Sequence, residues 1–225
     1  MKLTIGPVTI GRPALFRGEE QSAIFKQPAP GPVAIGPLGL EGNEVGDKLH
    51  HGGVNMAIHH YPHDHYKFWR DHLGGHELLE ASSAFGENIA TDGLTEDDVW
   101  IGDRLRLGSA LVEVSQGRKP CWKIDHKFQR KGMTAKVVET GRCGWYYRVI
   151  EPGVVAEGDM LELVERGHEG WSVARVFRLL LHKGANTAAL VGAARLDRLS
   201  QDWREKALER AVLQEKQAHE RRARG

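Results

Sequence analysis

Apolar positions in the first three quarters of the chain occur in short runs that glycine, proline or aspartate interrupts. Between Lys2 and about Arg166 these runs include Val8–Ile10, Val33–Ile35 and Leu111–Val114. Residues 102–107 and 158–163 share a further pattern, because each begins with Gly-Asp and then carries an apolar side chain at every second position. Alternation with a period of two is typical of a strand with one buried face. Many such strands predict a mainly β, closed or nearly closed barrel-like domain over residues 1–166.

The spacing of apolar residues becomes helical after Gly170. Ser172 is a suitable N-cap for a helix whose buried stripe is Val173, Val176, Phe177 and Leu180. A second helix is predicted around Leu190, Val191 and Ala194, and a third after Ser200 with Trp203, Ala207 and Ala211 on one face. Beyond about Gln214 almost no apolar residues remain, so this charged tail is expected to fray or to be disordered. Residues 167–225 are therefore predicted to form a small three-helix C-terminal domain.

Histidines are concentrated in the middle of the β-rich part, where eight of the twelve lie between His50 and His76. A helix is predicted near Pro62–His72, with Tyr66 and Trp69 on one face. The preceding histidines suggest zinc, but His59 and His60 would point to opposite faces of a strand. A zinc site needs three or four converging ligands, so we favour ordinary histidines around a strand-to-helix junction, one of which could face a pocket.

Charge and cysteine content narrow the classes of protein further. The 225 residues include 31 Lys+Arg and 30 Asp+Glu, a net charge of +1 that argues against an obligate nucleic-acid binder. No apolar stretch reaches the ~18 residues of a membrane span, and the N-terminal residues lack the apolar segment of a signal peptide. Two cysteines cannot form a disulfide framework, so a reducing, cytoplasmic location without membrane association is expected.

Several common catalytic motifs do not occur in the sequence. It contains no phosphate-binding P-loop, no strand-linked G-x-G-x-x-G, no H-E-x-x-H, no C-x-x-C and no G-x-S-x-G. P-loop NTPases, typical dinucleotide enzymes, zincins and α/β-hydrolases are therefore not the leading candidates.

Cys121 is the strongest candidate for chemistry. It follows a predicted strand and Pro120, and Arg118, Lys119 and Lys123 place three positive charges near it. Nearby cations favour the thiolate, which is the form that attacks as a nucleophile or binds a soft metal. The alternative is a small buried apolar residue beside Trp122. Cys143 is interpreted as structural.

Two glycine-containing turns are candidate anion-binding segments. The adjacent glycines of His51-Gly52-Gly53 let backbone N–H groups turn toward an anion, whose charge Lys48 or His51 could neutralise. Asn88 in Gly86-Glu87-Asn88 offers an amide side chain for a ligand. An ordinary turn is the alternative for each segment.

Five segments occur in an order that resembles MOSC domains, the family named for the C-terminal domain of molybdenum cofactor sulfurases. They are Gly39-Leu40-Glu41-Gly42, His51-Gly52-Gly53, Gly86-Glu87-Asn88, Ile101-Gly102-Asp103 and Arg118-Lys119-Pro120-Cys121. The segment Gly144-Trp145-Tyr146 and the three C-terminal helices resemble the YiiM-like subgroup. The resemblance covers roughly residues 30–210. Two positions depart from it, since Asn43 replaces a family aspartate and Gly117 stands where relatives often carry proline.

The resemblance implies a barrel-like domain that binds the molybdenum cofactor, a pterin dithiolene carrying one molybdenum. It implies that Cys121 ligates the metal and that the substrates are small N-hydroxylated compounds, including hydroxylaminopurine and other N-hydroxylated bases, amidoximes and hydroxylamines. The oxygen of the N–O group would pass to molybdenum, and a separate electron-donating reductase would restore the metal. We assign cofactor binding to Lys48, His51, Gly52, Gly53, Glu87, Asn88, Arg118 and Lys123, and catalysis and metal ligation to Cys121. Pyridoxal phosphate is not expected, since the sulfurases carry it on a separate module.

Other functions remain open at this point. Cys121 could carry a persulfide in a cofactor or sulfur carrier that does not turn over a substrate. The helical tail could instead serve a non-catalytic interaction module, although mixed charges on such a helix usually form a solvated face. A zinc hydrolase would retain activity without Cys121. The sequence leaves the oligomeric state open, a homodimer included.

Overall fold

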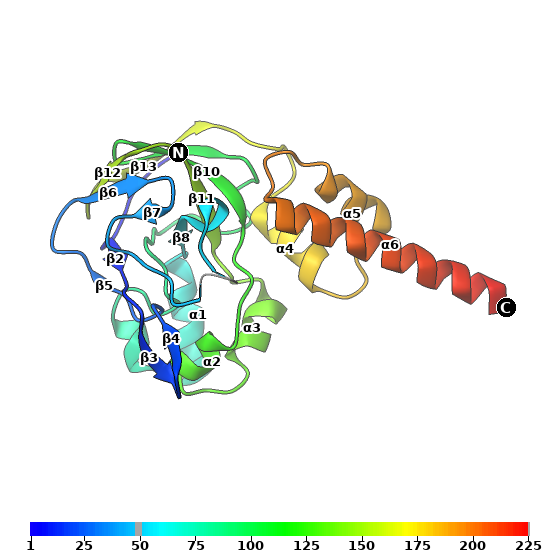
Figure 1. Ribbon diagram of the computed structural model, residues 1–225, viewed down its shortest axis with the longest axis horizontal. Coiled ribbons are helices and arrows are strands. Elements are labelled where there is room, and N and C mark those ends of the chain that lie inside the picture. Colours follow the sequence, from blue (N-terminus) through cyan, green and yellow to red (C-terminus); the bar gives the residue numbers. More distant parts are fainter. Residues whose placement is uncertain (48–50, 225) are drawn as a thin grey trace.

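A six-stranded antiparallel sheet forms the centre of the molecule in the computed structural model, which describes residues 1–47 and 51–224. Its strands lie in the order β1 (Lys2–Thr4), β13 (Met160–Glu165), β9 (Arg104–Leu107), β10 (Ala110–Gly117), β11 (Trp145–Glu151) and β8 (Ile58–His60). The sheet curls into a half barrel with β1 and β8 at its edges (Figure 1). The predicted mainly β, barrel-like body is thus confirmed.

Three smaller antiparallel sheets flank the half barrel. They are β12 (Gly153–Val155) with β6 (Val33–Gly36) and β7 (Gly39–Leu40), β2 (Thr9–Ile10) with β5 (Gln27–Pro28), and the hairpin β3 (Ala14–Arg17) with β4 (Glu20–Ser22). Residues 23–26, which follow the hairpin, approach the helix formed by Lys123–Lys127, because the Lys127 ammonium donates to the Ile24 carbonyl at 3.0 Å. The N-terminal strands therefore contribute one wall of the site described below.

The two Gly-Asp segments form neighbouring strands of the central sheet. Leu161 of β13 lies opposite Leu107 of β9, and Leu163 lies opposite Leu105. Both preceding turns close in the same way, because each aspartate accepts the N–H three residues earlier: Asp103 from Trp100, and Asp159 from Ala156. The period-two pattern thus predicted these strands correctly, with buried leucines of β9 alternating with partly exposed arginines.

Within its described residues the body also contains three α-helices and two short 3-10 helices. They are α1 (Asp64–Leu73), α2 (Lys123–Lys127) and α3 (Met133–Thr140), with η1 (Val54–Met56) and η2 (Glu77–Glu80). Helix α1 was predicted, and its Tyr66 and Trp69 are buried in the core. Helices α2 and α3 were not predicted, because they are too short to show a clear apolar period.

Three helices follow the sheet at the C-terminus, as the apolar spacing predicts. They are α4 (Val173–Leu181), α5 (Thr187–Ala194) and α6 (Gln201–Arg224). The Ser172 hydroxyl caps α4 by accepting the Arg175 N–H at 3.2 Å, and Asn186 caps α5 in the same way. The proposed division between residues 166 and 167 falls in the connection from β13 to α4.

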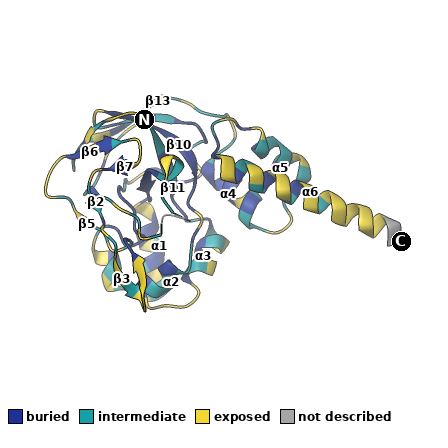
Figure 2. Cartoon of the chain, viewed as in Figure 1, coloured by how far each residue is buried: buried dark blue, intermediate teal, exposed yellow. Residues whose placement is uncertain are grey.

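The end of α6 differs from the expectation. The tail beyond Gln214 was expected to fray, whereas the structure continues the helix to Arg224, away from the body (Figures 1 and 2). Alanine, glutamate, glutamine, lysine and arginine dominate this segment, and all have high helix propensity, so a helix can extend there without an apolar face. No helix in the described part of the chain combines the length and apolarity of a membrane span.

A buried glutamate and a close backbone approach join the C-terminal helices to the sheet. Glu113 on β10 binds the guanidinium groups of Arg104 at 2.8 Å and Arg148 at 3.0 Å, and Arg198 before α6 lies 3.8 Å away. At the end of β10, a Cβ on Gly117 would meet the Trp203 ring at 3.0 Å. Gly117, one of the two departures from the family pattern, therefore makes room for α6 against the strand that leads to Cys121.

Candidate functional site

Cys121 lies in the loop that joins β10 to α2. Its carbonyl oxygen accepts hydrogen bonds from the Ile124 N–H and from the Thr134 hydroxyl, each at 3.1 Å. Its side chain is half-buried, whereas the other cysteine, Cys143, is fully buried. The thiol of Cys121 is thus positioned by two helices and is still reachable from outside.

Asp125 fixes the corner between α2 and α3 behind Cys121. One carboxylate oxygen accepts the Thr134 N–H and hydroxyl, both at 2.6 Å, and the other accepts the Gly132 N–H at 2.9 Å. Partial burial opposes ionisation, but these hydrogen bonds from Thr134 and Gly132 outweigh it and lower the pKa of Asp125. A charged carboxylate therefore holds the two helices together at neutral pH.

Two adjoining hollows meet at Cys121. The inner cavity, of about 100 Å³, lies between residues 22–26, the loop 43–46 and Arg118. The outer groove, of about 740 Å³, lies between the body and helices α4 and α6. Both are lined by His51, Gly52, Met56, Lys119, Cys121, Lys123 and Tyr146. A molecule in the groove can therefore approach a group held in the inner cavity at the cysteine.

Cationic side chains dominate the inner cavity. Arg118 is 6% exposed and Lys123 is 5% exposed, and Lys26 and Lys119 line the same space. The carboxylate on this lining is that of Glu44, which is exposed. So much positive charge inside a protein is costly unless an anion balances it.

Two buried nitrogen atoms of this cavity have no hydrogen-bond partner within the described residues. They are Nη1 of Arg118 and Nε2 of His59. Buried polar atoms are nearly always hydrogen-bonded in folded proteins, so an unpaired donor beside a cavity indicates a missing ligand. Nη1 of Arg118 thus points to an anionic or other acceptor group in the inner cavity, and Nε2 of His59 points to a further polar partner there.

The neighbouring charges also shift the pKa values of the cavity residues. Burial lowers the pKa of Lys26 to about 7, and Lys127 and Arg118 lower it while Glu87 opposes them. Burial, Arg118 and Lys26 hold the pKa of His59 well below its usual range. Lys127 has its pKa lowered to about 8 by burial. His59 is therefore neutral at pH 7, and Lys26 is poised to exchange its proton.

The glycines of the two predicted turns play different parts. Gly52 lines both hollows with φ +82°, and Gly53, with φ +84°, begins the short helix η1 beside them. Gly86 lines the inner cavity with φ +76°, where a Cβ would meet the Ile24 side chain at 2.8 Å. Lys48 lies outside the described residues.

Glu87 and Asn88 form hydrogen bonds within the protein. The Asn88 amide accepts the His59 N–H at 3.0 Å and donates to the Thr9 carbonyl at 2.9 Å, although the residue also lines the inner cavity. The Glu87 carboxylate binds the Tyr66 hydroxyl and accepts the Phe85 N–H, and it faces away from the inner cavity. Six residues of the predicted set thus lie on the inner cavity: Cys121, His51, Gly52, Asn88, Arg118 and Lys123. Glu87 does not line this cavity.

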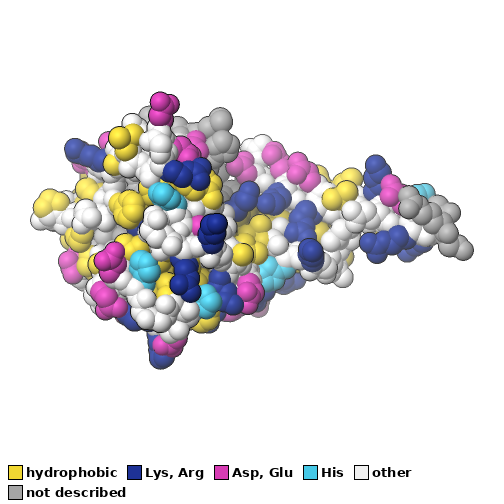
Figure 3. Space-filling view, turned by 90° about the horizontal axis from the view of Figure 1, so that it is seen from below, with side chains coloured by type: hydrophobic (Ala, Val, Ile, Leu, Met, Phe, Trp, Pro, Cys, Tyr) yellow, Lys and Arg dark blue, Asp and Glu magenta, His cyan; other side chains and the backbone are white. Residues whose placement is uncertain are grey.

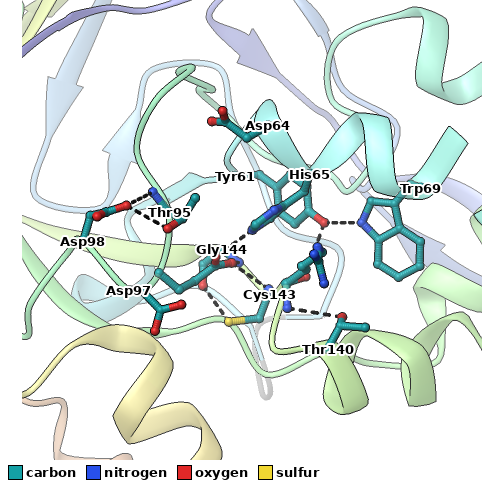
Figure 4. A network of polar contacts seen from close by, with 12 residues as sticks. Tyr61, Asp64, His65, Trp69, Thr95, Asp97, Asp98, Thr140, Cys143 and Gly144 are labelled. Atoms are coloured by element: carbon teal, nitrogen blue, oxygen red, sulfur yellow. Dashed lines mark hydrogen bonds and ion pairs between the residues drawn. The ribbon is translucent and has the colours of Figure 1, made fainter. Parts of the chain in front are cut away.

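A buried network around Glu96 supports Arg118 from behind. Glu96 accepts the Cys143 N–H at 2.8 Å and the Gly144 N–H at 2.6 Å, and it pairs with Nε2 of His65 at 2.7 Å (Figure 4). The Gly144 carbonyl in turn accepts the Arg118 N–H at 3.0 Å. Glu96 therefore fixes the position of Gly144, which in turn holds the backbone of Arg118.

The histidines of the 59–65 stretch separate in the structure. His59 faces the inner cavity, His60 binds Tyr147 and Thr91 in the core, and His63 pairs with Asp92 at the surface. No group of three His, Cys, Asp or Glu side chains within residues 1–47 and 51–224 could hold a metal ion.

Four residues of the inner cavity region were missed by the sequence reasoning or left unspecified. They are Lys26, His59, Lys127 and Tyr146. His59 and Tyr146 belong to segments that the sequence analysis discussed. The sequence did not show that His59 faces the cavity, and no role was assigned to Tyr146. Lys26 and Lys127 have no local pattern that distinguishes them from surface lysines. Asn43 replaces the family aspartate as a turn residue, because its side-chain oxygen accepts the Gly11 N–H at 3.2 Å.

Sulfate binding to the inner cavity is expected to weaken about tenfold from about pH 6 to about pH 8.5. The folded protein lowers the Lys26 pKa to about 7, so this ammonium loses its charge over that range while sulfate keeps its own. Isothermal titration calorimetry at several pH values measures the affinity, and binding above pH 7 should take up a proton. Lys26→Met should show a much smaller pH dependence, with the remainder due to Lys127, whose pKa is about 8; an equal slope in both proteins would contradict the assignment.

Comparison with known proteins places this geometry in a family. Residues 47–162 match the MOSC domain, and residues 171–210 match the YiiM-like 3-alpha helix domain. Protein YiiM of Escherichia coli (strain K12) is 42% identical over 159 residues, 71% of each chain. A protein of Gibberella moniliformis named "Reductase" is 36% identical over 180 residues, which are 80% of this chain and 32% of that protein.

A solved structure agrees with the sequence matches. The crystal structure of YiiM from Geobacillus stearothermophilus superposes with a TM-score of 0.79 at 35% identity, over 93% of this chain and 99% of that one. The MOSC match covers β8 to β11 of the half barrel and the cavity residues around Cys121, and the second match covers the helical residues that line the groove. The chain therefore belongs to the MOSC domain family and has its YiiM-like form, a MOSC domain followed by three helices.

Proposed function

We propose that this protein is a molybdenum-cofactor-dependent reductase of N-hydroxylated compounds. The observation that carries the proposal is the position of Cys121, between an inner cavity with a cationic lining and an unpaired Arg118 nitrogen and an outer groove open to small molecules. The MOSC family is of the type that binds molybdenum cofactor, and the relative named "Reductase" supports oxidoreductase chemistry.

The residues present fit the pterin cofactor. A thiolate is a soft ligand that suits molybdenum, and Cys121 offers one half-buried thiol. Nη1 of Arg118 and Nε2 of His59 lack partners, and the cofactor offers a phosphate and a polar pterin ring to such groups. Lys123 adds a buried ammonium beside the thiol. When bound, the cofactor supplies a two-electron redox centre for the reductive removal of the hydroxyl oxygen.

The protein's own groups have separate tasks in this scheme. Cys121 binds the metal, Arg118 and Lys123 orient the anionic cofactor, and the Lys26 ammonium holds a proton near neutral pH. The groove admits the substrate from the side of the C-terminal helices. Electrons come from a separate reductase.

A direct test uses protein purified from a molybdate-replete host and from a host unable to make the pterin. We expect near-stoichiometric molybdenum by elemental analysis in the first preparation alone. With reduced methyl viologen as electron donor, that preparation should convert hydroxylaminopurine to the aminopurine, an amidoxime to its amidine and hydroxylamine to ammonia, each with release of water. Molybdenum-loaded protein that reduces none of these would overturn the proposal. Cyanide-releasable sulfur on Cys121 without turnover would favour the carrier function instead.

A further inference from the structure

The outer groove has the size and composition of a binding site for a substrate larger than a free base. Its volume of about 740 Å³ lies within the ~300–1,000 Å³ range of small-molecule pockets. The body contributes Gln116, Pro120 and Trp122, and the helices contribute Leu180, Trp203 and Lys206. The helices therefore complete a site whose chemistry lies at Cys121.

Two lysines in the groove lack ionic partners. Lys119 stands two residues before Cys121 and Lys206 stands on α6, and neither makes an ion pair or hydrogen bond with another described residue. Burial, Lys119 and Arg210 lower the pKa of Lys206 while Glu209 opposes them, so the two lysines are close enough to repel each other. Figure 3 shows Lys and Arg side chains gathered over the junction between the body and the C-terminal helices. Two cations that line one groove without an ion pair to a described residue favour an anionic ligand there.

The acidic residues of the groove do not neutralise this pair. Glu20 binds Arg17 at 3.6 Å, and Asp47 has an interaction partner of its own. Asp202 lies in the first turn of α6, where the N-terminal end of the helix favours a negative charge. The positive charge of the two lysines is therefore available to a ligand.

Trp122 provides an aromatic surface in the same groove. Its ring is half-buried, and the Arg17 guanidinium lies 3.9 Å from the ring centroid, which fixes its orientation. Phe16 packs against the same ring with a centroid distance of 5.8 Å. The part of the ring that these contacts leave uncovered lines the groove and offers an aromatic surface to a planar heterocycle.

We infer that the outer groove binds aromatic substrates carrying a phosphate monoester, the nucleoside monophosphate class, with Lys119 and Lys206 at the phosphate and Trp122 against the base. This inference rests on the proposed function for its turnover but not for its binding. It places the phosphate on the C-terminal helices and the N-hydroxylated base toward Cys121. The C-terminal helices then select the substrate.

The binding test uses adenosine 5′-monophosphate and adenosine as probes with the purified holoprotein. Calorimetry or tryptophan fluorescence should show the monophosphate binding at least about tenfold more tightly than adenosine. Lys206→Met should abolish that difference, whereas Lys216→Met, the same change on an exposed part of α6, should leave it intact. Equal affinity of the two probes for the wild-type protein would overturn the inference.

The turnover test compares hydroxylaminopurine with its ribonucleoside 5′-monophosphate, with reduced methyl viologen as donor. We expect a higher kcat/KM for the monophosphate, and Lys206→Met should lower it to the value of the free base.

Molybdenum content separates the two sources of phosphate: a loss of metal in Lys206→Met would assign the lysine to the cofactor and overturn the inference. An effect seen with a protein reductase but not with viologen would assign the lysines to an acidic partner and also overturn it. If the monophosphate probe binds in a manner that depends on Lys206 but the protein reduces none of the substrates, the inferred binding site is supported and the proposed function is refuted.

Discussion

Cys121→Ser is expected to lower the molybdenum content of the purified protein to less than about a tenth and to reduce N-hydroxy reduction by at least about 100-fold. Serine keeps the size of the side chain, but its hydroxyl is a hard, neutral donor at pH 7 and does not replace a thiolate. The half-buried thiol lines both hollows, so no other cysteine can take its place there. Elemental analysis and viologen oxidation measure the two effects.

Cys143 provides the control for this experiment. It is fully buried, its thiol donates to the Gly144 carbonyl at 3.1 Å, and burial beside Glu96 raises its pKa well above the usual value. Cys143→Ser should therefore retain molybdenum. Iodoacetamide should alkylate Cys121 in the folded apoprotein and leave Cys143 unmodified by mass spectrometry. Full metal content and activity in Cys121→Ser would refute the role of this cysteine.

Glu96→Ala is expected to lower the free energy of unfolding by about 3 kcal/mol, which corresponds to roughly 6–12 °C in Tm. The change leaves the N–H groups of Cys143 and Gly144 and the ring of His65 without their partner inside the protein. Each buried polar group left without a hydrogen bond costs ~1–3 kcal/mol, and the substitution leaves several such groups at once. Thermal and urea unfolding measure the loss.

The network predicts a second effect of the same variant on the cavity. Gly144 holds the Arg118 backbone, so sulfate binding should weaken under conditions in which the Glu96→Ala protein is still folded. Glu139→Ala, which removes an exposed carboxylate paired with Lys136, should change stability by less than about 0.5 kcal/mol and leave sulfate binding unaltered. If the two variants behave alike, Glu96 does not support the site.

The fold was predictable wherever a local pattern and a turn residue agreed. The leucines after Gly102-Asp103 and Gly158-Asp159 alternate, and both segments became paired strands. The Ser172 cap and the apolar spacing after it predicted α4. The β-rich body and the helical C-terminus thus follow from residues close together in the chain. Helices α2 and α3 were missed because each spans only one or two turns.

The candidate site was predictable only around Cys121 and the two glycine turns. Arg118 and Lys123 were identified because they flank the cysteine, and the structure places both on the inner cavity. Glu87 was identified for a similar reason, yet its carboxylate is taken by Tyr66 and the backbone. A side chain next to a glycine turn faces either the cavity or the core, and the local sequence does not say which.

The sequence by itself determined the β-rich body, the three C-terminal helices, the likeness to MOSC domains and the cluster of cations at Cys121. Only the tertiary structure decided which distant residues join that cluster. Lys26 reaches the cavity from the connection between β4 and β5, His59 reaches it from β8, and Lys206 reaches the groove from α6. Elements form from interactions within a few residues, whereas a cavity forms where packed elements meet. The unpaired donors, the lowered pKa of Lys26 and the groove all arise from that packing.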